Sequence, residues 1–302
     1  MKKNSNLKFT EFFLSKYKNF DFHFHLLLAG ARFGYDEIFE IFGDKLKVTG
    51  FDPDVNECKR LNKIYQNKKK FLPYCLFEDK IEKEFYEYNH KSSSSLYKIN
   101  ENFVKKFHSK MNFETETIHK VQTETLDNIF DSEKISKVDF MQIDCEGAEL
   151  NILKGASKLL ENTICIETEI LFQKDIRLSA PNYSTLDNYL INKNYSLYDI
   201  ELFRFSKVPS AERIADYKDD DGNNIPGPTL KGQVLAGDAV YFKNLGMNDN
   251  YSDFSFEELI KYLFLLEIYF MQDTAYDLVL NSKEIIEKNT DRTYLEFLNF
   301  FY

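Results

Sequence analysis

Short apolar runs alternate with amphipathic stretches from residue 23 to about residue 165 of the 302-residue chain. The runs that predict strands are residues 25–29, 47–52, 71–77, 138–144 and 163–172. Helical periodicity lies between them, at residues 35–42, 55–65 and 148–160. This alternation is typical of repeated βα units around a mostly parallel sheet. We therefore expect an α/β fold with a Rossmann-like, doubly wound sheet.

The second half of the chain departs from this alternation. Residues 195–205 and 234–242 are strand patterns on either side of a turn-rich segment, residues 218–228, and predict an antiparallel hairpin at the sheet edge. After Asn250 the periodicity is helical. We expect an N-terminal lead-in (1–22), an α/β domain (23–248) and a C-terminal helical extension (249–302). A serine-rich stretch, residues 89–95, predicts a mobile loop over the strand ends.

The first candidate site follows the first strand, where LLLAGARFGYDEIF leads through Gly30 and Gly34 into a helix. Glycines at such a turn let the backbone approach a nucleotide-like ligand, with the helix N-terminus directed at it. The pattern also suits a tight turn without a ligand, and Arg32 replaces the second glycine of the dinucleotide fingerprint GxGxxG. Asp52, at the end of the next strand, is placed to accept hydrogen bonds from ribose hydroxyls or to cap a helix, for which Asp54 is the better candidate.

The most specific pattern is KVDFMQIDCEGAELNILKGA, at residues 137–156. Its strand delivers Asp144 and Glu146 at the carboxyl end of the sheet, where ligands of open α/β sheets bind. Two acids there are costly to leave unpaired. We therefore expect them to act as a base, to ligate a metal or to contact a ligand.

This segment resembles the signature of FkbM-type methyltransferases, in which a strand is followed by Asp-x-Glu-Gly-Ala-Glu and a helix ending in Lys-Gly-Ala. Other segments are similar to family segments in the same order, namely FLPYCLFEDK with SSSSLYKIN, TETLDNIF, ETEILF and GQVLAGDAVYFKN. The resemblance covers about residues 23–245, and the C-terminal helices resemble an extension found in some members. It implies an S-adenosylmethionine-dependent methyltransferase that acts on an oxygen of a small molecule or carbohydrate.

Carried over to this chain, the resemblance assigns five residues to the cofactor. Gly30, Ala31 and Gly34 would shape the S-adenosylmethionine loop. Asp52 would hold the ribose, and Asp79, in the turn after the third strand, would lie near the adenine. These roles are implied by the resemblance and not by spacing alone.

From their position beyond the strand end, we predict that Asp144 and Glu146 are the catalytic residues, either as a general base or through a hard divalent cation such as Mg²⁺. Two positions depart from the methyltransferase pattern: Leu28 stands where an acid is usual, and Arg32 stands where Asn is common. Two alternatives therefore stay open. The spacing from Gly30 to the acid of the next strand also suits a nicotinamide-dependent oxidoreductase, and the two departures suit a degenerate, non-catalytic scaffold.

Composition narrows the partners and the compartment. A formal net charge of -10 argues against nucleic acid as the main partner. The most apolar stretch, residues 263–271, contains Glu267 and is too short to span a membrane, and the N-terminus lacks the apolar core of a signal peptide. The four cysteines form no CxxC or CxxH pair, which fits a reducing cytoplasm. The sequence does not predict an oligomeric state.

Three weaker patterns are interpreted as structural. His23 and His25 share a strand face, but no third metal ligand is identifiable nearby. The serines of residues 92–95 lack a GxSxG elbow or a partnered histidine, which favours a loop. Alternating residues that could bind calcium are Asp219, Asp221 and Asn223. The segment lacks the glycine that a calcium-binding loop needs at its sixth position, so we interpret it as a turn.

Overall fold

A seven-stranded sheet forms the centre of the computed structural model, which describes residues 1–66, 69–107, 115–133, 135, 137–207, 217–218, 224–225, 232–244 and 255–302. The strand order is β3-β2-β1-β7-β8-β12-β9. Strands β3, β2, β1, β7 and β8 are mutually parallel, and β12 is antiparallel to both of its neighbours. The strands are β1 (Phe24–Ala29), β2 (Leu46–Phe51), β3 (Lys70–Leu72), β7 (Phe140–Ile143), β8 (Cys165–Leu171), β9 (Tyr195–Phe205) and β12 (Gln233–Lys243). The predicted α/β fold with a mostly parallel sheet is confirmed.

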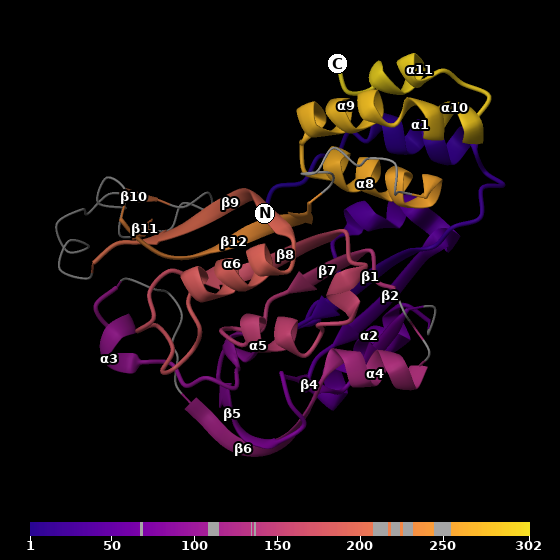
Figure 1. The fold of residues 1–302 in the computed structure, drawn as a ribbon. Coiled ribbons are helices and arrows are strands. Elements are labelled where there is room, and N and C mark those ends of the chain that lie inside the picture. Colours follow the sequence, from indigo (N-terminus) through magenta and orange to yellow (C-terminus); the bar gives the residue numbers. More distant parts are fainter. Residues whose placement is uncertain are drawn as a thin grey trace.

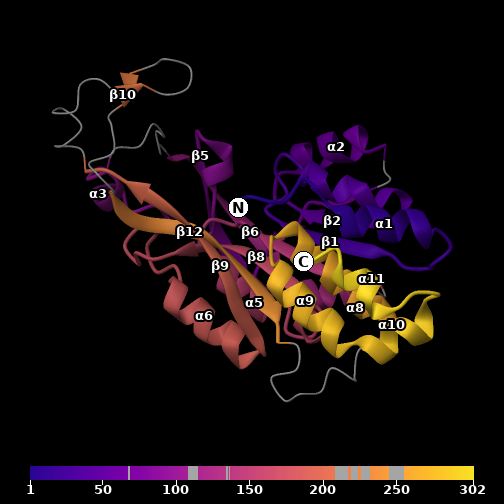
Figure 2. The ribbon, with the colours of Figure 1, turned by 90° about the horizontal axis from the view of Figure 1, so that it is seen from above.

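Helices cover both faces of this sheet (Figures 1 and 2). One face packs against η1 (Glu37–Lys45), α2 (Val55–Ile64) and α8 (Phe256–Ile268). The other packs against α4 (Leu126–Glu133), α5 (Glu149–Lys154) and α6 (Tyr183–Asn192). Successive residues of a strand point to opposite faces, so that Leu26 and Leu28 enter the first core and Leu27 enters the second. The sheet is therefore doubly wound, as its nearly continuous apolar strands require.

The predicted edge hairpin is confirmed, with β9 at the edge and β12 between β9 and β8. The alternating burial of β9 is that of an edge strand with one solvated face. The segment that joins the two strands contains β10 (Tyr217–Lys218) and β11 (Asn224–Ile225), which pair with each other. Most of the predicted turn at residues 218–228, including Asp219, Asp221 and Asn223, lies outside the described residues.

The predicted strand at residues 71–77 is wrong in its length. It divides into β3, which joins the main sheet, and β4 (Cys75–Leu76), which pairs with another strand. Pro73 lies at the break and has no N–H to donate to a ladder. β4 belongs to a second sheet of order β4-β6-β5, with β5 (Glu82–Tyr88) and β6 (Thr115–Glu124). This sheet was not predicted, and it lies beside the carboxyl ends of β1 and β2 (Figure 1).

Two predicted helices also differ from the structure. The first is a 3₁₀ helix, η1, interrupted at Gly43, where φ is 53°. The helix expected at residues 148–160 is shorter: α5 ends at Lys154, and a separate 3₁₀ turn, η3 (Leu159–Glu161), follows. Gly155 ends α5 against the backbone of Phe77, since a Cβ at Gly155 would lie 2.3 Å from the Phe77 carbonyl oxygen. Close contact with the chain after β4 therefore accompanies the end of the helix. Two short elements precede β6: η2 (Lys91–Ser93) and α3 (Glu101–Val104).

The N-terminal helix packs with the C-terminal helices (Figure 1). α1 (Lys8–Lys16) lies beside α8, and the C-terminal group continues with α9 (Gln272–Asn281), α10 (Lys283–Asn289) and α11 (Tyr294–Leu298). The ring of Phe9 lies 6.0 Å from that of Phe264 and 5.4 Å from that of Phe297. Glu267, buried in α8, accepts hydrogen bonds from the backbone N–H groups of Phe9 (2.7 Å) and Thr10 (2.9 Å). The lead-in and the extension thus form one layer, while the domain boundaries stay a prediction.

Within the described residues, no helix has both the length and the apolar character to cross a membrane. His23, which precedes β1, and His25, within β1, do not form a metal-binding pair. His23 is exposed, whereas His25 is buried, with Nε2 2.9 Å from the Thr49 hydroxyl and Nδ1 3.2 Å from the Lys137 carbonyl. Burial lowers the pKa of His25 to about 4, so that it is a neutral core residue.

Candidate active site

A cavity of about 880 Å³ opens at the carboxyl ends of β1 and β2. The β4–β6 sheet and the serine-rich loop bound its far side. Its lining includes Gly30, Arg32, Phe33, Asp52, Asp54, Val55, Cys75, Leu76, Phe85, Ser92, Ser95, Val121, Asp144, Cys145 and Ala148. We call it the donor cavity, because the resemblance implies that a methyl donor binds at these residues. It has the size of small-molecule sites, which are about 300–1,000 Å³, and its lining combines apolar side chains with a few convergent polar groups.

Gly30 brings the glycine-rich turn directly against the end of β7. Its φ is +81°, and a Cβ there would lie 1.8 Å from the Asp144 carbonyl oxygen. The N–H groups of Gly30 and Ala31 both donate to the Phe51 carbonyl, at 3.0 and 2.8 Å. Ala31 and Gly34 (φ +95°) do not line the donor cavity, and they shape the turn from behind. Only glycine fits at residue 30 without moving the neighbouring strand.

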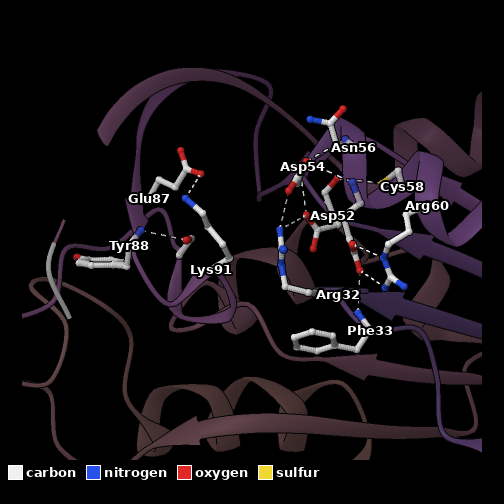
Figure 3. A network of polar contacts seen from close by, with 12 residues as sticks. Arg32, Phe33, Asp52, Asp54, Asn56, Cys58, Arg60, Glu87, Tyr88 and Lys91 are labelled. Atoms are coloured by element: carbon white, nitrogen blue, oxygen red, sulfur yellow. Dashed lines mark hydrogen bonds and ion pairs between the residues drawn. The ribbon is translucent and has the colours of Figure 1, made fainter. Parts of the chain in front are cut away.

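The sequence left two roles open for Asp52, ribose binding and helix capping, and the structure gives the capping role to Asp54. Asp54 caps α2, since its Oδ1 accepts from the N–H of Asn56 at 2.9 Å. Asp52 is buried, lines the donor cavity and accepts the Asp54 N–H at 2.8 Å. Burial raises its pKa, against the opposing effects of the Asp54 N–H and of Arg32. Figure 3 shows the Arg32 guanidinium between the two carboxylates, with Nη2 3.0 Å from Asp54 and 3.6 Å from Asp52.

Asp79 lies away from this group. Its side chain is exposed in the turn after β4, and it is not among the residues that line the donor cavity. Its backbone carbonyl accepts the Thr123 hydroxyl at 2.6 Å, which fixes the turn against β6. The cavity is instead lined in this region by Cys75 and Leu76. The role of Asp79 near the adenine stays a prediction.

Asp144 lies where two cavities meet. It lines the donor cavity and also a smaller one, of about 250 Å³, on the other side of the strand end. Its N–H donates to the Ala29 carbonyl at 2.9 Å, which fixes it beside the glycine turn. Burial, and then the neighbouring acids Glu146 and Glu149, raise the pKa of Asp144 well above its usual value. Asp144, whose side chain is accessible from the cavities, is therefore a stronger base than an ordinary aspartate.

Glu146 follows Asp144 by two residues but has a different environment. Its φ is 57°, and its carboxylate pairs with Arg177, whose side chain is only 2% exposed. It is not among the lining residues of either cavity. The structure therefore does not bring the two predicted catalytic acids to the same cavity surface.

Arg177 was missed by the sequence analysis, and it holds the serine-rich loop in place. Its guanidinium donates to the carbonyls of Tyr97 (3.1 Å) and Ser93 (3.0 Å). The Ser95 hydroxyl in turn donates to the Glu146 carbonyl at 2.8 Å. The loop expected to be mobile is thus packed over the strand ends by buried hydrogen bonds. No local pattern around Arg177 indicates this role.

Glu149, the last acid of the signature, supports the turn between β7 and α5. Its Oε1 accepts the N–H groups of Cys145 and Gly147, both at 2.9 Å. Burial raises the pKa of Glu149 to about 7, although these backbone hydrogen bonds act in the opposite direction. Glu149 therefore shapes the backbone that presents Asp144.

The family follows from a sequence match. The family model for the methyltransferase FkbM domain matches residues 29–197, more than half of the chain. The chain belongs to the FkbM methyltransferase family. No curated protein sequence matches it significantly.

Solved structures of other methyltransferases are distantly similar to this FkbM methyltransferase. One is a TehB-like SAM-dependent methyltransferase from Corynebacterium glutamicum (TM-score 0.34, 11% identity, covering 78% of this chain and 88% of that one). Another is 1,6-didemethyltoxoflavin-N1-methyltransferase from Burkholderia thailandensis (TM-score 0.33, 9% identity, covering 80% and 79%). A third is magnesium protoporphyrin IX methyltransferase from Synechocystis PCC 6803 (TM-score 0.32, 5% identity, covering 80% of each chain). With TM-scores this low, the assignment rests on the family match alone.

As an FkbM methyltransferase, the protein is S-adenosylmethionine-dependent. The donor cavity fits such a ligand, since Gly30 holds the turn in its wall against the strand end and the buried Asp52 offers hydrogen-bond acceptors to a ribose. Arg32 lies closer to Asp54 than to Asp52, so that the Asp52 carboxylate can still accept hydrogen bonds from a ligand.

A divalent cation does not fit the residues present. Among the described residues, no group of three or more His, Cys, Asp or Glu side chains is arranged to hold a metal ion. Of the two proposed ligands, Glu146 is already paired with Arg177.

Proposed function

We propose that this FkbM methyltransferase transfers a methyl group to a hydroxyl oxygen of a small molecule or carbohydrate, with Asp144 as the general base. The observation that carries the proposal is the position of Asp144 between the donor cavity and the smaller cavity. An acceptor in the smaller cavity and a methyl donor in the larger one would meet at this side chain. Holding the two reactants in line is the main source of rate in a methyl transfer.

The residues of this chain have separate tasks in the proposed reaction. When bound, S-adenosylmethionine supplies an electrophilic methyl group on a sulfonium. Asp52 holds the ribose, and Gly30 keeps the turn packed on the strand end in the wall of the donor cavity. Attack by the acceptor oxygen on that methyl carbon would release the donor's sulfur with the electron pair of the carbon–sulfur bond. Asp144, in its ionised form, takes the hydroxyl proton, and its raised pKa makes it a stronger base for this step.

Glu146 acts through position in this proposal. Its ion pair with Arg177 holds the serine-rich loop, which forms part of the wall of the donor cavity. Glu146→Gln would weaken this wall, while Asp144→Asn would remove the base. The two substitutions therefore affect cofactor affinity and turnover differently.

The test is release of S-adenosylhomocysteine and mass-spectrometric detection of a methylated product, after incubation with extracts or sugar-nucleotide pools from the protein's own source. Asp144→Asn is expected to lower kcat by about 10²–10⁴-fold and to change the Kd for S-adenosylhomocysteine less than threefold. Asp131→Asn is the matched control, because Asp131 is exposed on α4 and pairs with Lys158. Full turnover of Asp144→Asn would remove Asp144 from the mechanism.

The same protein tests the two alternatives. In a thermal-shift experiment, stabilisation by NAD but not by S-adenosylmethionine or S-adenosylhomocysteine would favour the nicotinamide-dependent oxidoreductase. Calorimetry that shows no binding of either cofactor at millimolar concentration would favour a scaffold without catalysis. Arg32 beside Asp52 motivates the second measurement, since it occupies part of the cavity where a ribose would lie.

A further inference from the structure

The smaller cavity, of about 250 Å³, is lined mostly by polar side chains at the carboxyl ends of β7 and β8 and beside β12. We call it the acceptor cavity, a name that rests on the proposed function. Its lining includes five carboxylates, from Asp36, Asp144, Glu167, Glu169 and Asp238. So many acids around a small space need cations or protons to balance them.

The strand register places three of these acids in one row. In the pairing of β12 with β8, Asp238 lies opposite Glu169. In the pairing of β7 with β8, Ile143 lies opposite Thr168, so that Asp144 comes next to Glu169. The pairing of β12 with β9 extends the row, because Glu201 lies opposite Asp238. Neighbouring strands are about 4.8 Å apart, and like charges directly opposite each other destabilise a sheet.

The cations near this row balance only part of it. Lys3 Nζ lies 2.9 Å from Glu167 and 3.5 Å from Asp36. The amino group of Met1 lies 3.3 Å from both Asp238 and Glu201. These contacts leave the middle of the row, at β7 and β8, without a cation.

Asp144 and Glu169 occupy that middle position. Within the described residues, no ion pair reaches either side chain, and Glu169 Oε2 is shut off from solvent without a hydrogen-bond partner. The Arg177 guanidinium pairs with Glu146 and acts on Asp144 and Glu169 only as a charge without direct contact. Loss of solvation, and then the neighbouring acids with Glu146 first among them, raise the pKa of both groups well above the usual carboxyl range. The charge of Arg177 offsets this repulsion only in part, since both pKa values stay raised, and an incoming cation would relieve the rest.

We propose that Glu169 and Asp238, which lie in one row with Asp144, bind a protonated amino group of the methyl acceptor, so that the acceptor is a hydroxyl compound that also carries an amine, such as an amino sugar. An ammonium group has three donors and no acceptor, which matches a wall of carboxylate oxygens. The cavity volume suits a group of monosaccharide size. With the amine at Glu169 and Asp238, a hydroxyl of the same molecule reaches Asp144 at the border of the donor cavity.

Calorimetry on the full chain, saturated with S-adenosylhomocysteine, tests this inference with three probes. D-glucosamine carries the cation, and D-glucose and N-acetyl-D-glucosamine are its uncharged matches. At pH 7 we expect glucosamine to bind at least tenfold more tightly than either. Equal affinity for the three sugars, with S-adenosylhomocysteine binding intact, overturns the inference and leaves the proposed function standing. Loss of S-adenosylhomocysteine binding by the wild type would contradict the proposed function instead.

Two variants locate the site. Glu169→Gln and Asp238→Asn are each expected to weaken glucosamine binding at least tenfold while changing the affinity for S-adenosylhomocysteine less than twofold, because neither residue lines the donor cavity. Asp131→Asn on α4 is the control and should leave both affinities unchanged. Unchanged glucosamine affinity in both variants would place any binding elsewhere and overturn the inference.

The melting temperature of the unliganded protein gives an independent readout. Because the raised pKa of Glu169 makes its ionised form costly in the free protein, we expect Glu169→Gln to raise the melting temperature by a few degrees at high pH and by less at pH 5, while abolishing the preference for glucosamine. A purely structural carboxylate would show the reverse, a lower melting temperature. That result would contradict the premise that Glu169 is uncompensated in the free protein.

Discussion

A buried ion pair between Lys261 of α8 and Asp139, just before β7, gives the sharpest test of how the C-terminal helices join the sheet. Lys261 Nζ lies 3.0 Å from Asp139 Oδ1 and 2.9 Å from Oδ2, and the side chains are 3% and 1% exposed. Asp139 also accepts the His25 N–H at 2.7 Å, and Lys261 contacts Glu257 at 2.6 Å. Lys261→Met keeps most of the apolar stem and removes the charge.

The loss of stability in Lys261→Met depends on the Asp139 charge, which stays buried without its partner. Removing one partner of a buried pair leaves the other charge uncompensated and costs about 3–5 kcal/mol. Burial already raises the pKa of Asp139, against the opposing effect of Lys261. Without Lys261 this pKa rises further, so that Asp139 can escape the penalty by binding a proton. A raised folded-state pKa contributes stability at low pH that is lost as pH increases. The loss in Lys261→Met should therefore be larger at pH 8 than at pH 5.

Urea unfolding followed by circular dichroism measures this effect. At pH 7 we expect Lys261→Met to lower the free energy of unfolding by about 3 kcal/mol. The double variant Lys261→Met with Asp139→Asn removes both charges and should recover at least half of that loss, since an amide still accepts the His25 N–H. A single variant within 1 kcal/mol of wild type, or a double variant no more stable than the single one, would refute the reasoning.

Three further predictions concern the loop, the site wall and the core. Gly30→Ala should weaken S-adenosylhomocysteine binding at least tenfold, because the added Cβ would lie 1.8 Å from the Asp144 carbonyl oxygen. Calorimetry measures this affinity, and the control Gly43→Ala, whose Cβ has nothing within 4 Å, should bind S-adenosylhomocysteine as the wild type does. Arg177→Met should speed hydrogen exchange in the backbone of residues 91–96, which mass spectrometry resolves, because the carbonyl of Ser93 loses its donor; unchanged exchange would show that the loop is held by other contacts. Because the pKa of His25 is lowered to about 4 in the folded protein, His25 is protonated in the unfolded chain first as pH falls below 6.5, and up to about 3 kcal/mol of stability should be lost by pH 4. Urea unfolding of His25→Gln should show a smaller loss of stability over that pH range. An equal loss in the variant would mean that other groups cause it.

Much of the fold could be predicted because the signals are local. Continuous apolar runs such as residues 25–29 are typical of strands buried on both faces, and the αβ alternation restricts their arrangement to a doubly wound sheet. The predictions were wrong where a contact distant in sequence set the boundary. α5 ends where Gly155 meets Phe77, and β4 leaves the main sheet to pair with β6. Neither partner is visible from the segment itself.

The candidate site divides in the same way. Gly30, Asp52 and Asp144 each follow a strand, and the carboxyl ends of neighbouring parallel strands meet at one edge, so that the sequence brings them together. Glu146 and Asp79 follow strands as well, but their side chains lie elsewhere, one paired with Arg177 and the other exposed in a turn. Position after a strand predicts the edge of the sheet and not the direction of the side chain.

The sequence by itself thus determined the sheet, the glycine turn and the family, because each depends on residues that are close along the chain. The tertiary structure alone decided which charges meet. Arg177 contacts Glu146, Lys261 contacts Asp139, and the acidic row at Asp238 depends on the register of three strands. A shift of register by one residue would move that row to the opposite face of the sheet. Register is fixed by packing over the whole sheet, which no local pattern records.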